Sequence, residues 1–144
     1  MRKRKKFFVG EIEVKSNLEK LIGEQLLQRS SGFIYEKESY KWKEKLPRAI
    51  CGECETKGKC FVERSYKPDF FLSNGIILEV KGRFTSKDRK IAAAMKEQHP
   101  ELDIRMVFSK NNWITRQHKT NYGQWCDSKG ILWTVNDIPE EWLR

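Results

Sequence analysis

Residues 68–82, "PDFFLSNGIILEVKG", decide the fold, because two apolar runs enclose a short polar turn. The runs are typical of strands in a buried hairpin, yet they carry Asp69, Glu79 and Lys81. Successive strand residues point to opposite faces, so Glu79 and Lys81 share one face while Val80 points to the other. The stretch therefore raises the question of why a buried hairpin holds two carboxylates and an amine.

The length of the turn decides where Asp69 points. A two-residue turn would place Asp69 opposite Val80 and away from Glu79. A three-residue turn, with Gly75 in the left-handed conformation, would place Asp69 directly opposite Glu79 on one face. We expect the three-residue turn, because the alternative scatters the charged side chains over both faces of the hairpin.

Facing carboxylates indicate a metal site. With Cβ atoms about 5 Å apart, they repel each other unless a proton or a cation lies between them. Mg²⁺ binds one or two carboxylates together with waters and a substrate phosphate, and Lys81 would position the attacking water. This chemistry is metal-assisted phosphodiester hydrolysis. The alternative is an edge hairpin whose charges face water; Pro68, the apolar flanks and the exit at Gly82 favour a site.

The composition favours a nucleic acid as the partner. The chain has 144 residues, enough for a single domain over residues 1–144, and 29 Lys and Arg against 20 Asp and Glu give a net charge of +9. Such an excess favours polyanions, although it would also serve solubility alone. No segment approaches about 18 consecutive apolar residues, so we expect no membrane span. Residues 1–15 are a basic lead-in.

The order of elements predicts an α/β fold with a mixed central β-sheet flanked by helices, because strands alternate with helices after residue 60. Ser16 and Ser86 are expected to open helices, and Gly130 is expected to end one. The helices are expected at residues 16–30, 85–99 and 122–130, and the strands at 33–46, 61–72, 75–82, 102–109 and 131–135.

The hairpin and its surroundings resemble known nucleases. "PD" followed by "ExK" is similar to the PD-(D/E)xK nuclease superfamily, which has a restriction-endonuclease-like core. "YKPDFFLSNGIILEVKG", "DRK", "EQHPELDIRMVFS" and "YGQWC" together resemble the phage endonuclease I family, the Holliday-junction resolvases of T-seven-like phages. The resemblance covers residues 16–36 and 66–143 in matching order and spacing.

The resemblance implies a function and a site. It implies a segment-swapped homodimer that cuts branched DNA at four-way junctions with Mg²⁺ or Mn²⁺. Asp69 and Glu79 match the metal ligands of the family, Lys81 matches its lysine, and the backbone carbonyl of Val80 is a further ligand. A phage protein of this kind would act in the cytoplasm of the bacterial host.

Glu19 has two interpretations. Ser16-x-x-Glu19 is a capping-box signature, and capping is the default explanation from the residues alone. On a helical wheel, Glu19 lies at the edge of the apolar face. The resemblance adds that Ser16, Leu18 and Glu19 match the stretch that opens the first helix of the family, where the acid completes the active site of the partner subunit.

The segment 37–65 departs from the family. Where the family has an extended bridge between the halves of the dimer, this segment is longer and contains Cys51, Cys54 and Cys60. Their spacing resembles a zinc knuckle, and the alternative is three free thiols in a surface insertion. The candidates for a fourth zinc ligand are Cys126, His99, His118 and a residue of a second subunit. We expect Cys126 to be a core thiol and His99 to have a structural role at a helix end.

Cations near the hairpin are expected to bind DNA phosphates. Arg83, Lys87, Arg89 and Lys90 follow the "ExK" strand, and the alternative is a solvated helix face. The basic lead-in and the loop at residues 110–120 would add affinity that does not depend on DNA sequence.

Two rival functions remain open at this stage. The first is another PD-(D/E)xK DNA nuclease, of the restriction or mismatch type, which would show a sequence preference. The second is a non-catalytic, zinc-containing DNA-binding module, or a nuclease-like scaffold, which would bind DNA without cutting it under any divalent ion.

Overall fold

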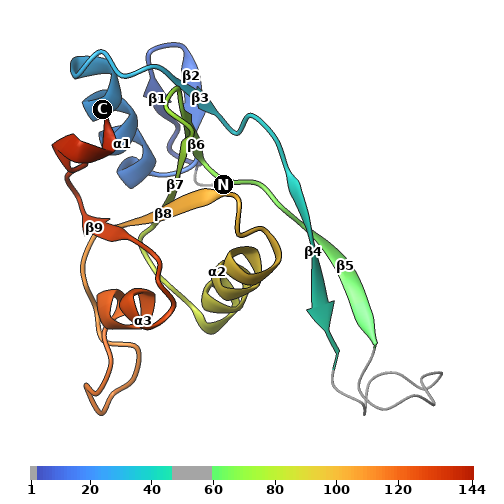
Figure 1. The fold of residues 1–144 in the computed structure, drawn as a ribbon. Helices are drawn as coiled ribbons and strands as arrows, with labels where there is room; N and C mark the ends of the chain where they lie inside the picture. Colours follow the sequence, from blue (N-terminus) through green and yellow to red (C-terminus); the bar gives the residue numbers. More distant parts are fainter. Residues whose placement is uncertain (1–2, 47–59) are drawn as a thin grey trace.

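A mixed five-stranded β-sheet organises the chain. The structure is a computed structural model that describes residues 3–46 and 60–144. The strand order is β3 (Phe33–Tyr35), β6 (Phe70–Leu72), β7 (Ile76–Lys81), β8 (Asp103–Phe108) and β9 (Trp133–Val135). β3, β6 and β7 pair antiparallel, whereas β7, β8 and β9 pair parallel (Figure 1). The predicted mixed sheet is therefore confirmed.

Helices cover both faces of the sheet. Helix α1 (Asn17–Gln28) packs on one face through Ile22 and Leu26, which join a core cluster with Phe70, Leu78 and Val107. Helices α2 (Ser86–Gln98) and α3 (Tyr122–Ser128) lie on the other face. The side chains that form the second cluster there are Phe84, Met106, Phe108, Tyr122, Cys126 and Ile131.

The β6–β7 hairpin has the predicted three-residue turn. Phe70 pairs with Leu78 and Phe71 pairs with Ile77, and continuing this register places Asp69 opposite Glu79. Gly75 has a φ of 92°, a conformation that a residue with a Cβ atom rarely adopts. The hairpin therefore has the register that puts the predicted acids on one face.

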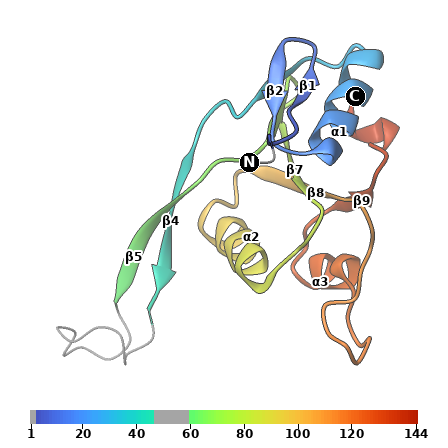
Figure 2. The ribbon, with the colours of Figure 1, turned by 180° about the vertical axis from the view of Figure 1, so that it is seen from behind.

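The predicted strands at 33–46 and 61–72 are each divided into two. β3 and β6 belong to the main sheet, while β4 (Tyr40–Lys45) and β5 (Phe61–Tyr66) form a separate two-stranded ribbon, called the arm below. Glu36, with a φ of 48°, interrupts the first chain segment, and Pro68 has no N–H with which to continue the second. The arm leaves the body and passes beside α2 (Figures 1 and 2).

The basic lead-in is more ordered than its charge suggested. β1 (Phe7–Val9) and β2 (Ile12–Val14) form an antiparallel hairpin within residues 1–15. Val9 and Val14 are buried, and Val9 packs so closely on α1 that a Cβ atom at Gly23 would lie 2.6 Å from a Val9 methyl group. Two buried valines thus anchor the second half of this basic lead-in to the body of the protein.

The remaining elements are close to the predicted ones. α1 begins after Ser16 with a capping box, and α2 also has a capping box, with Thr85 rather than Ser86 at the N-cap. The chain ends with a short 3₁₀ helix, η1 (Glu140–Trp142). No helix within residues 3–46 and 60–144 has the length and apolar character needed to cross a bilayer.

Candidate active site

The three predicted acids are the buried charged side chains of the described residues. Glu19, Asp69 and Glu79 are only 5%, 6% and 5% exposed, and they line one cavity of about 230 Å³. Lys15 and Lys81 line the same cavity. Burying a charge without a partner is costly, so a gathering of acids in one cavity indicates a site rather than a stabilising feature.

Asp69 lies just before β6, where its two oxygens have different surroundings. Its Oδ2 accepts a hydrogen bond from the backbone N–H of Val80 at 2.8 Å. Its backbone carbonyl accepts the N–H of Glu36, which ties the residue to the end of β3. Within the described chain, Oδ1 has no hydrogen-bond donor, so this oxygen is open to a ligand in the cavity.

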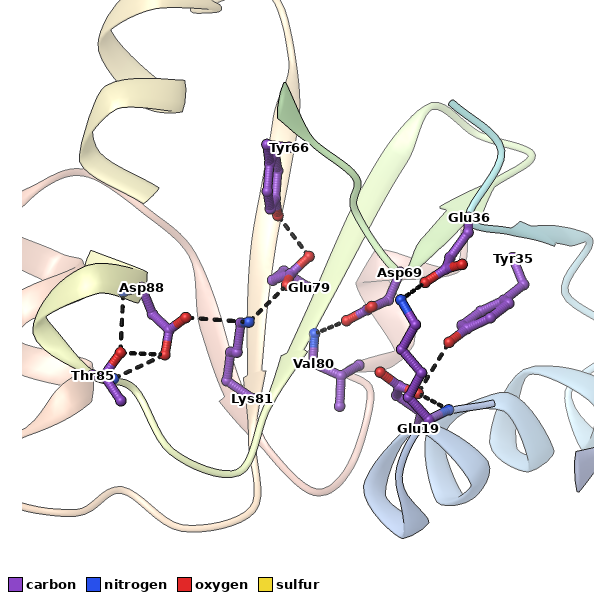
Figure 3. A network of polar contacts seen from close by, with 11 residues as sticks. Glu19, Tyr35, Glu36, Tyr66, Asp69, Glu79, Val80, Lys81, Thr85 and Asp88 are labelled. Atoms are coloured by element: carbon purple, nitrogen blue, oxygen red, sulfur yellow. Dashed lines mark hydrogen bonds and ion pairs between the residues drawn. The ribbon is translucent and has the colours of Figure 1, made fainter. Parts of the chain in front are cut away.

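Glu79 lies near the end of β7 and is held from two sides. The hydroxyl of Tyr66 donates to its Oε2 at 2.6 Å, and the Nζ of Lys81 lies 3.4 Å from its Oε1. The same Nζ lies 3.3 Å from Asp88, whose other oxygen accepts the N–H and the hydroxyl of Thr85. Asp88 therefore both caps α2 and fixes the lysine (Figure 3).

Glu19 combines capping with a place in the site. Its Oε2 accepts the backbone N–H groups of Lys15 and Ser16, at 2.6 and 3.2 Å, and the hydroxyl of Tyr35 at 3.1 Å. Lys15 also forms an ion pair with Glu36. Both interpretations of Glu19 are thus compatible, because capping uses one oxygen and Oε1 has no donor among the described residues.

Burial and mutual repulsion disfavour charge on the acids. Burial, reinforced by the charge of Glu79, raises the pKa of Asp69 to about 8, although the Val80 N–H partly offsets this. Burial also raises the pKa of Glu79, against the hydrogen bond from Tyr66 and the charge of Lys81. A cation in the cavity would remove this repulsion.

Lys81 keeps its proton. Burial acts to lower its pKa, but the combined attraction of Glu79 and Asp88 outweighs burial, and the pKa is raised. The hydroxyl of Tyr66 likewise stays protonated, because burial and the charge of Glu79 raise its pKa well above the ordinary value. Both groups are therefore hydrogen-bond donors at neutral pH.

The register also exposes the carbonyl of Val80. Since the N–H of Val80 points toward Asp69, its carbonyl points to the same side of β7. The residue opposite Val80 in the continued register is Pro68, which has no N–H to donate. The ladder therefore supplies no donor to this carbonyl from β6, which leaves the oxygen available beside Asp69.

The donor set fits a hard divalent cation. No group of three or more Asp, Glu, His or Cys side chains in residues 3–46 and 60–144 is already arranged as a metal site. Mg²⁺ requires less, since one or two protein carboxylates with waters and substrate oxygens complete its coordination. The two acids on the hairpin, Asp69 and Glu79, meet that requirement, and Glu19 lies across the same cavity.

Comparisons with known proteins show the family of the chain. The family described as "Phage endonuclease I" matches residues 53–144, more than half of the chain. The chain is also 39% identical over 133 residues to "Endonuclease I" of Escherichia phage T7, a match that covers 90% of this chain and 78% of the relative. The chain belongs to the phage endonuclease I family. The predicted resemblance is thereby confirmed.

A second relative of the phage endonuclease I family matches a shorter part. "Endodeoxyribonuclease 1" of Enterobacteria phage T3 is 49% identical over 75 residues, which are 51% of this chain and 49% of the relative.

The predicted DNA-binding cations of this family member separate into two pairs. Arg89 donates to the backbone carbonyl of Phe84 at 2.6 Å, and Lys90 forms an ion pair with Glu44 on the arm at 2.7 Å. Arg83 and Lys87 are exposed and have no ion pair within the described residues. Protein contacts thus occupy one pair, whereas the other pair is available for phosphates.

The predicted zinc ligands lie largely outside the described residues. Cys51 and Cys54 are not described, and Cys60 is disulfide-bonded, a state in which its sulfur is not a thiolate ligand. Cys126 is the predicted core thiol, fully buried, and burial raises its pKa to about 12. Zinc binding by Cys51, Cys54 and Cys60 stays a prediction, and it requires that Cys60 be reduced to the thiol.

The two histidines have structural contacts. His99 caps the end of α2, and its Nε2 lies 2.6 Å from the carbonyl of Lys41, so its predicted structural role is confirmed. The ring of His118 stacks on Trp113 with centroids 5.2 Å apart.

Sequence reasoning missed four residues of the site: Lys15, Tyr35, Tyr66 and Asp88. Thr85-x-x-Asp88 is a capping box, so the sequence could have placed Asp88 at the start of α2. No local pattern marks Tyr66, because its contact with Glu79 joins different β-ribbons.

Proposed function

We propose that the chain is a structure-selective endodeoxyribonuclease that resolves four-way DNA junctions by divalent-metal-dependent phosphodiester hydrolysis. One observation carries the proposal: the buried charged side chains of the described residues are three acids around a single cavity beside Lys81. The printed names of the two phage relatives, an endonuclease and an endodeoxyribonuclease, support DNA as the substrate.

Four groups would hold Mg²⁺ or Mn²⁺. They are the carboxylates of Asp69, Glu79 and Glu19 and the carbonyl of Val80. The bound ion would polarise the phosphoryl oxygen and lower the pKa of a water molecule. Hard cations prefer these oxygen donors, and the repulsion between the acids favours their neutralisation by a metal rather than by protons.

Lys81 acts as a donor rather than as a base. Its raised pKa keeps it charged, so its Nζ can hold a phosphate oxygen or orient the attacking water. Asp88 and Glu79 fix the amine from two directions, at 3.3 and 3.4 Å. Lys81 therefore stabilises charge that develops on the phosphate during hydrolysis.

The dimer forms by exchange of the N-terminal part of the chain. In a single chain, α1 brings Glu19 to the cavity that holds Asp69 and Glu79. The part that carries α1, residues 3–35, is joined to the rest through residues 36–66, which include the arm strands β4 and β5. Two copies that exchange this part rebuild the same site from two chains. Two sites at a fixed angle then suit a four-way junction in the host cytoplasm.

Phosphate contacts would come from cations beside β7. Arg83 and Lys87 are exposed at the start of α2, directly after the strand that carries Glu79 and Lys81. Contacts with phosphates position DNA without reading its sequence. The substrate is therefore selected by shape more than by sequence.

Cleavage of a synthetic four-way junction beside a linear duplex of the same sequence tests the function. We expect paired nicks near the branch point with Mg²⁺ or Mn²⁺ and none with Ca²⁺. Glu79→Gln removes one ligand charge and should lower the cleavage rate about 10²–10³-fold, because the electrostatic stabilisation of the transition state is lost. Its junction affinity in Ca²⁺ should stay within about threefold of wild type.

Glu24→Gln is the matched control, since it makes the same change at a half-exposed acid on α1 that lies outside the cavity. Equal cleavage of junction and duplex would mean that the chain is another type of PD-(D/E)xK nuclease and not a junction resolvase. Junction binding without cleavage under every divalent ion tested would mean that the chain is a non-catalytic DNA-binding module.

Mixed dimers test the exchange. Glu19→Gln and Glu79→Gln homodimers should each be inactive. When the two variants are co-expressed, the exchanged dimer pairs the intact Glu19 of one chain with the intact Glu79 of the other, so one wild-type site returns. Cleavage by the mixed dimer should recover to a substantial fraction of the wild-type rate, as nicks in one strand. An absence of recovery in a verified mixed dimer would mean that each site is built from one chain.

A further inference from the structure

We propose that Tyr66 is a positioning residue through which the arm sets the orientation of Glu79. This inference rests on the proposed metal-dependent function and deepens it, because it assigns control of the ligand carboxylate to an element outside the main sheet. Tyr66 is the last residue of β5 and pairs with Tyr40 at the base of the arm. Its side chain lines the cavity that holds the acids.

The contact distinguishes the two oxygens of Glu79. Tyr66 donates to Oε2 at 2.6 Å, while Lys81 lies 3.4 Å from Oε1 (Figure 3). No other described residue donates a hydrogen bond to Oε2. A glutamate side chain has several rotatable bonds, so a short hydrogen bond to one oxygen restricts the direction of the other. Tyr66 therefore aims Oε1 at the place where Lys81 and the cavity meet.

The arm reaches the site by two routes. Through the main chain, Tyr66 is followed by Lys67 and Pro68 and then by Asp69, so the base of the arm leads directly into one site acid. Through the hydroxyl of Tyr66, the arm holds Glu79, the second acid. A displacement of the arm would therefore change both carboxylates at once.

The arm is itself fixed to α2. The side chain of Gln98 accepts the N–H of Lys43 at 2.7 Å and donates to its carbonyl at 2.8 Å. Lys90 on α2 also pairs with Glu44 on β4. These contacts hold the ribbon from which Tyr66 extends, so they contribute to the alignment of Glu79.

Metal affinity is the quantity that this role controls. Loss of a group that orients a metal ligand typically lowers affinity or activity about 10–100-fold. Tyr66→Phe keeps the ring and removes the hydroxyl, so the packing beside Glu79 is preserved. Tyr40→Phe is the matched control, because Tyr40 pairs with Tyr66 in the ladder but donates its hydroxyl to Glu38, at 2.8 Å.

Calorimetric titration with Mn²⁺, and junction cleavage against Mg²⁺ concentration, test the proposal. For Tyr66→Phe we expect a Kd for Mn²⁺ about tenfold above wild type and a matching rise in the Mg²⁺ concentration for half-maximal cleavage. Cleavage at saturating metal should return to within about threefold of wild type, because the metal then holds Glu79 in place. Tyr40→Phe should equal wild type in both measurements.

A second variant tests the arm. Gln98→Ala removes the two bonds to Lys43 without touching the site and should raise the Kd for Mn²⁺ a few-fold. An unchanged Kd would overturn the control by the arm.

Three results would overturn the role of Tyr66. Wild-type affinity for Mn²⁺ in Tyr66→Phe, while the wild-type protein binds metal and cleaves, would refute the positioning role and leave the proposed function intact. Slower cleavage at saturating metal with an unchanged Kd would do the same. Failure of the wild-type protein itself to bind Mn²⁺ or to cleave would remove the proposed function and this inference together.

Discussion

The β6–β7 hairpin and the β4–β5 arm are both antiparallel ribbons, yet they differ in what surrounds them. Five of the six residues of β7 are buried, whereas Trp42 is the single buried residue of the arm strands. A ribbon packed on both faces holds its side chains in fixed places, including charged ones. The exposed ribbon carries charges that water solvates. Glu79 accordingly lies on the buried ribbon and Asp69 directly precedes it, whereas the arm extends away from the body of the protein (Figure 1).

The largest expected difference between the two ribbons is in the stability cost of shortening one of their apolar side chains. Leu78 on β7 is fully buried in the first core cluster, so Leu78→Ala removes transfer energy and leaves a cavity. We expect a loss of about 2–5 kcal/mol in the free energy of unfolding. Val62→Ala on the half-exposed β5 should cost less than about 1 kcal/mol. Chemical denaturation of both variants measures the difference.

Similar losses for the two variants would break the comparison. They would show that the arm is packed as tightly in solution as the hairpin, which is the result expected if a second subunit covers it.

Removal of the Asp69 charge should change the free energy of unfolding by less than Leu78→Ala does, and the change should depend on pH. The pKa of Asp69 is raised from 3.8 to about 8 in the folded protein, so between these values the folded protein holds a proton that the unfolded chain has lost. The stabilising contribution of this bound proton on Asp69 is fully present below pH 3.8 and is lost as the pH rises through 8. Asp69→Asn removes the titration. In chelator, its stability relative to wild type should therefore rise with pH across this window.

The expected rise is at least about 1.4 kcal/mol, the equivalent of one pKa unit. Thermal or urea unfolding in chelator from pH 4 to 8 measures it, and Asp137→Asn, the same change at an exposed position, is the control. Added Mn²⁺ should raise the free energy of unfolding of the wild type and leave that of Asp69→Asn unchanged. A pH-independent difference between Asp69→Asn and wild type would mean that Asp69 is ionised throughout.

The hairpin could be predicted from the sequence because local constraints agree. Gly75 permits the three-residue turn, and placing Asp69 opposite Glu79 keeps the charges on one face. The arm could not be delimited in this way. Its strands are more charged than β3 and β6 but follow them along the chain without a marked turn motif, and the break depends on a single positive φ at Glu36 and on Pro68.

The acids of the candidate site could be predicted from the sequence, but the groups that orient them could not. The spacing of the "PD" and "ExK" motifs identifies Asp69 and Glu79 from the sequence, because both residues belong to one hairpin. Tyr35 and Tyr66 reach the acids from other elements, and a contact between distant segments leaves no local pattern. The N-terminal hairpin was missed because the run of charges at residues 2–6 masked the apolar residues that follow it, of which Val9 and Val14 are buried.

The double use of Glu19 affects how variants at this position can be read. One side chain closes the first turn of α1 and also faces the cavity, so a substitution with Ala would damage a helix and a site at once. A loss of function in such a variant is then ambiguous between misfolding and chemistry. Glutamine at this position keeps an oxygen that can serve the capping box and removes only the charge. For this residue, the conservative exchange is the informative experiment and the alanine scan is the misleading one.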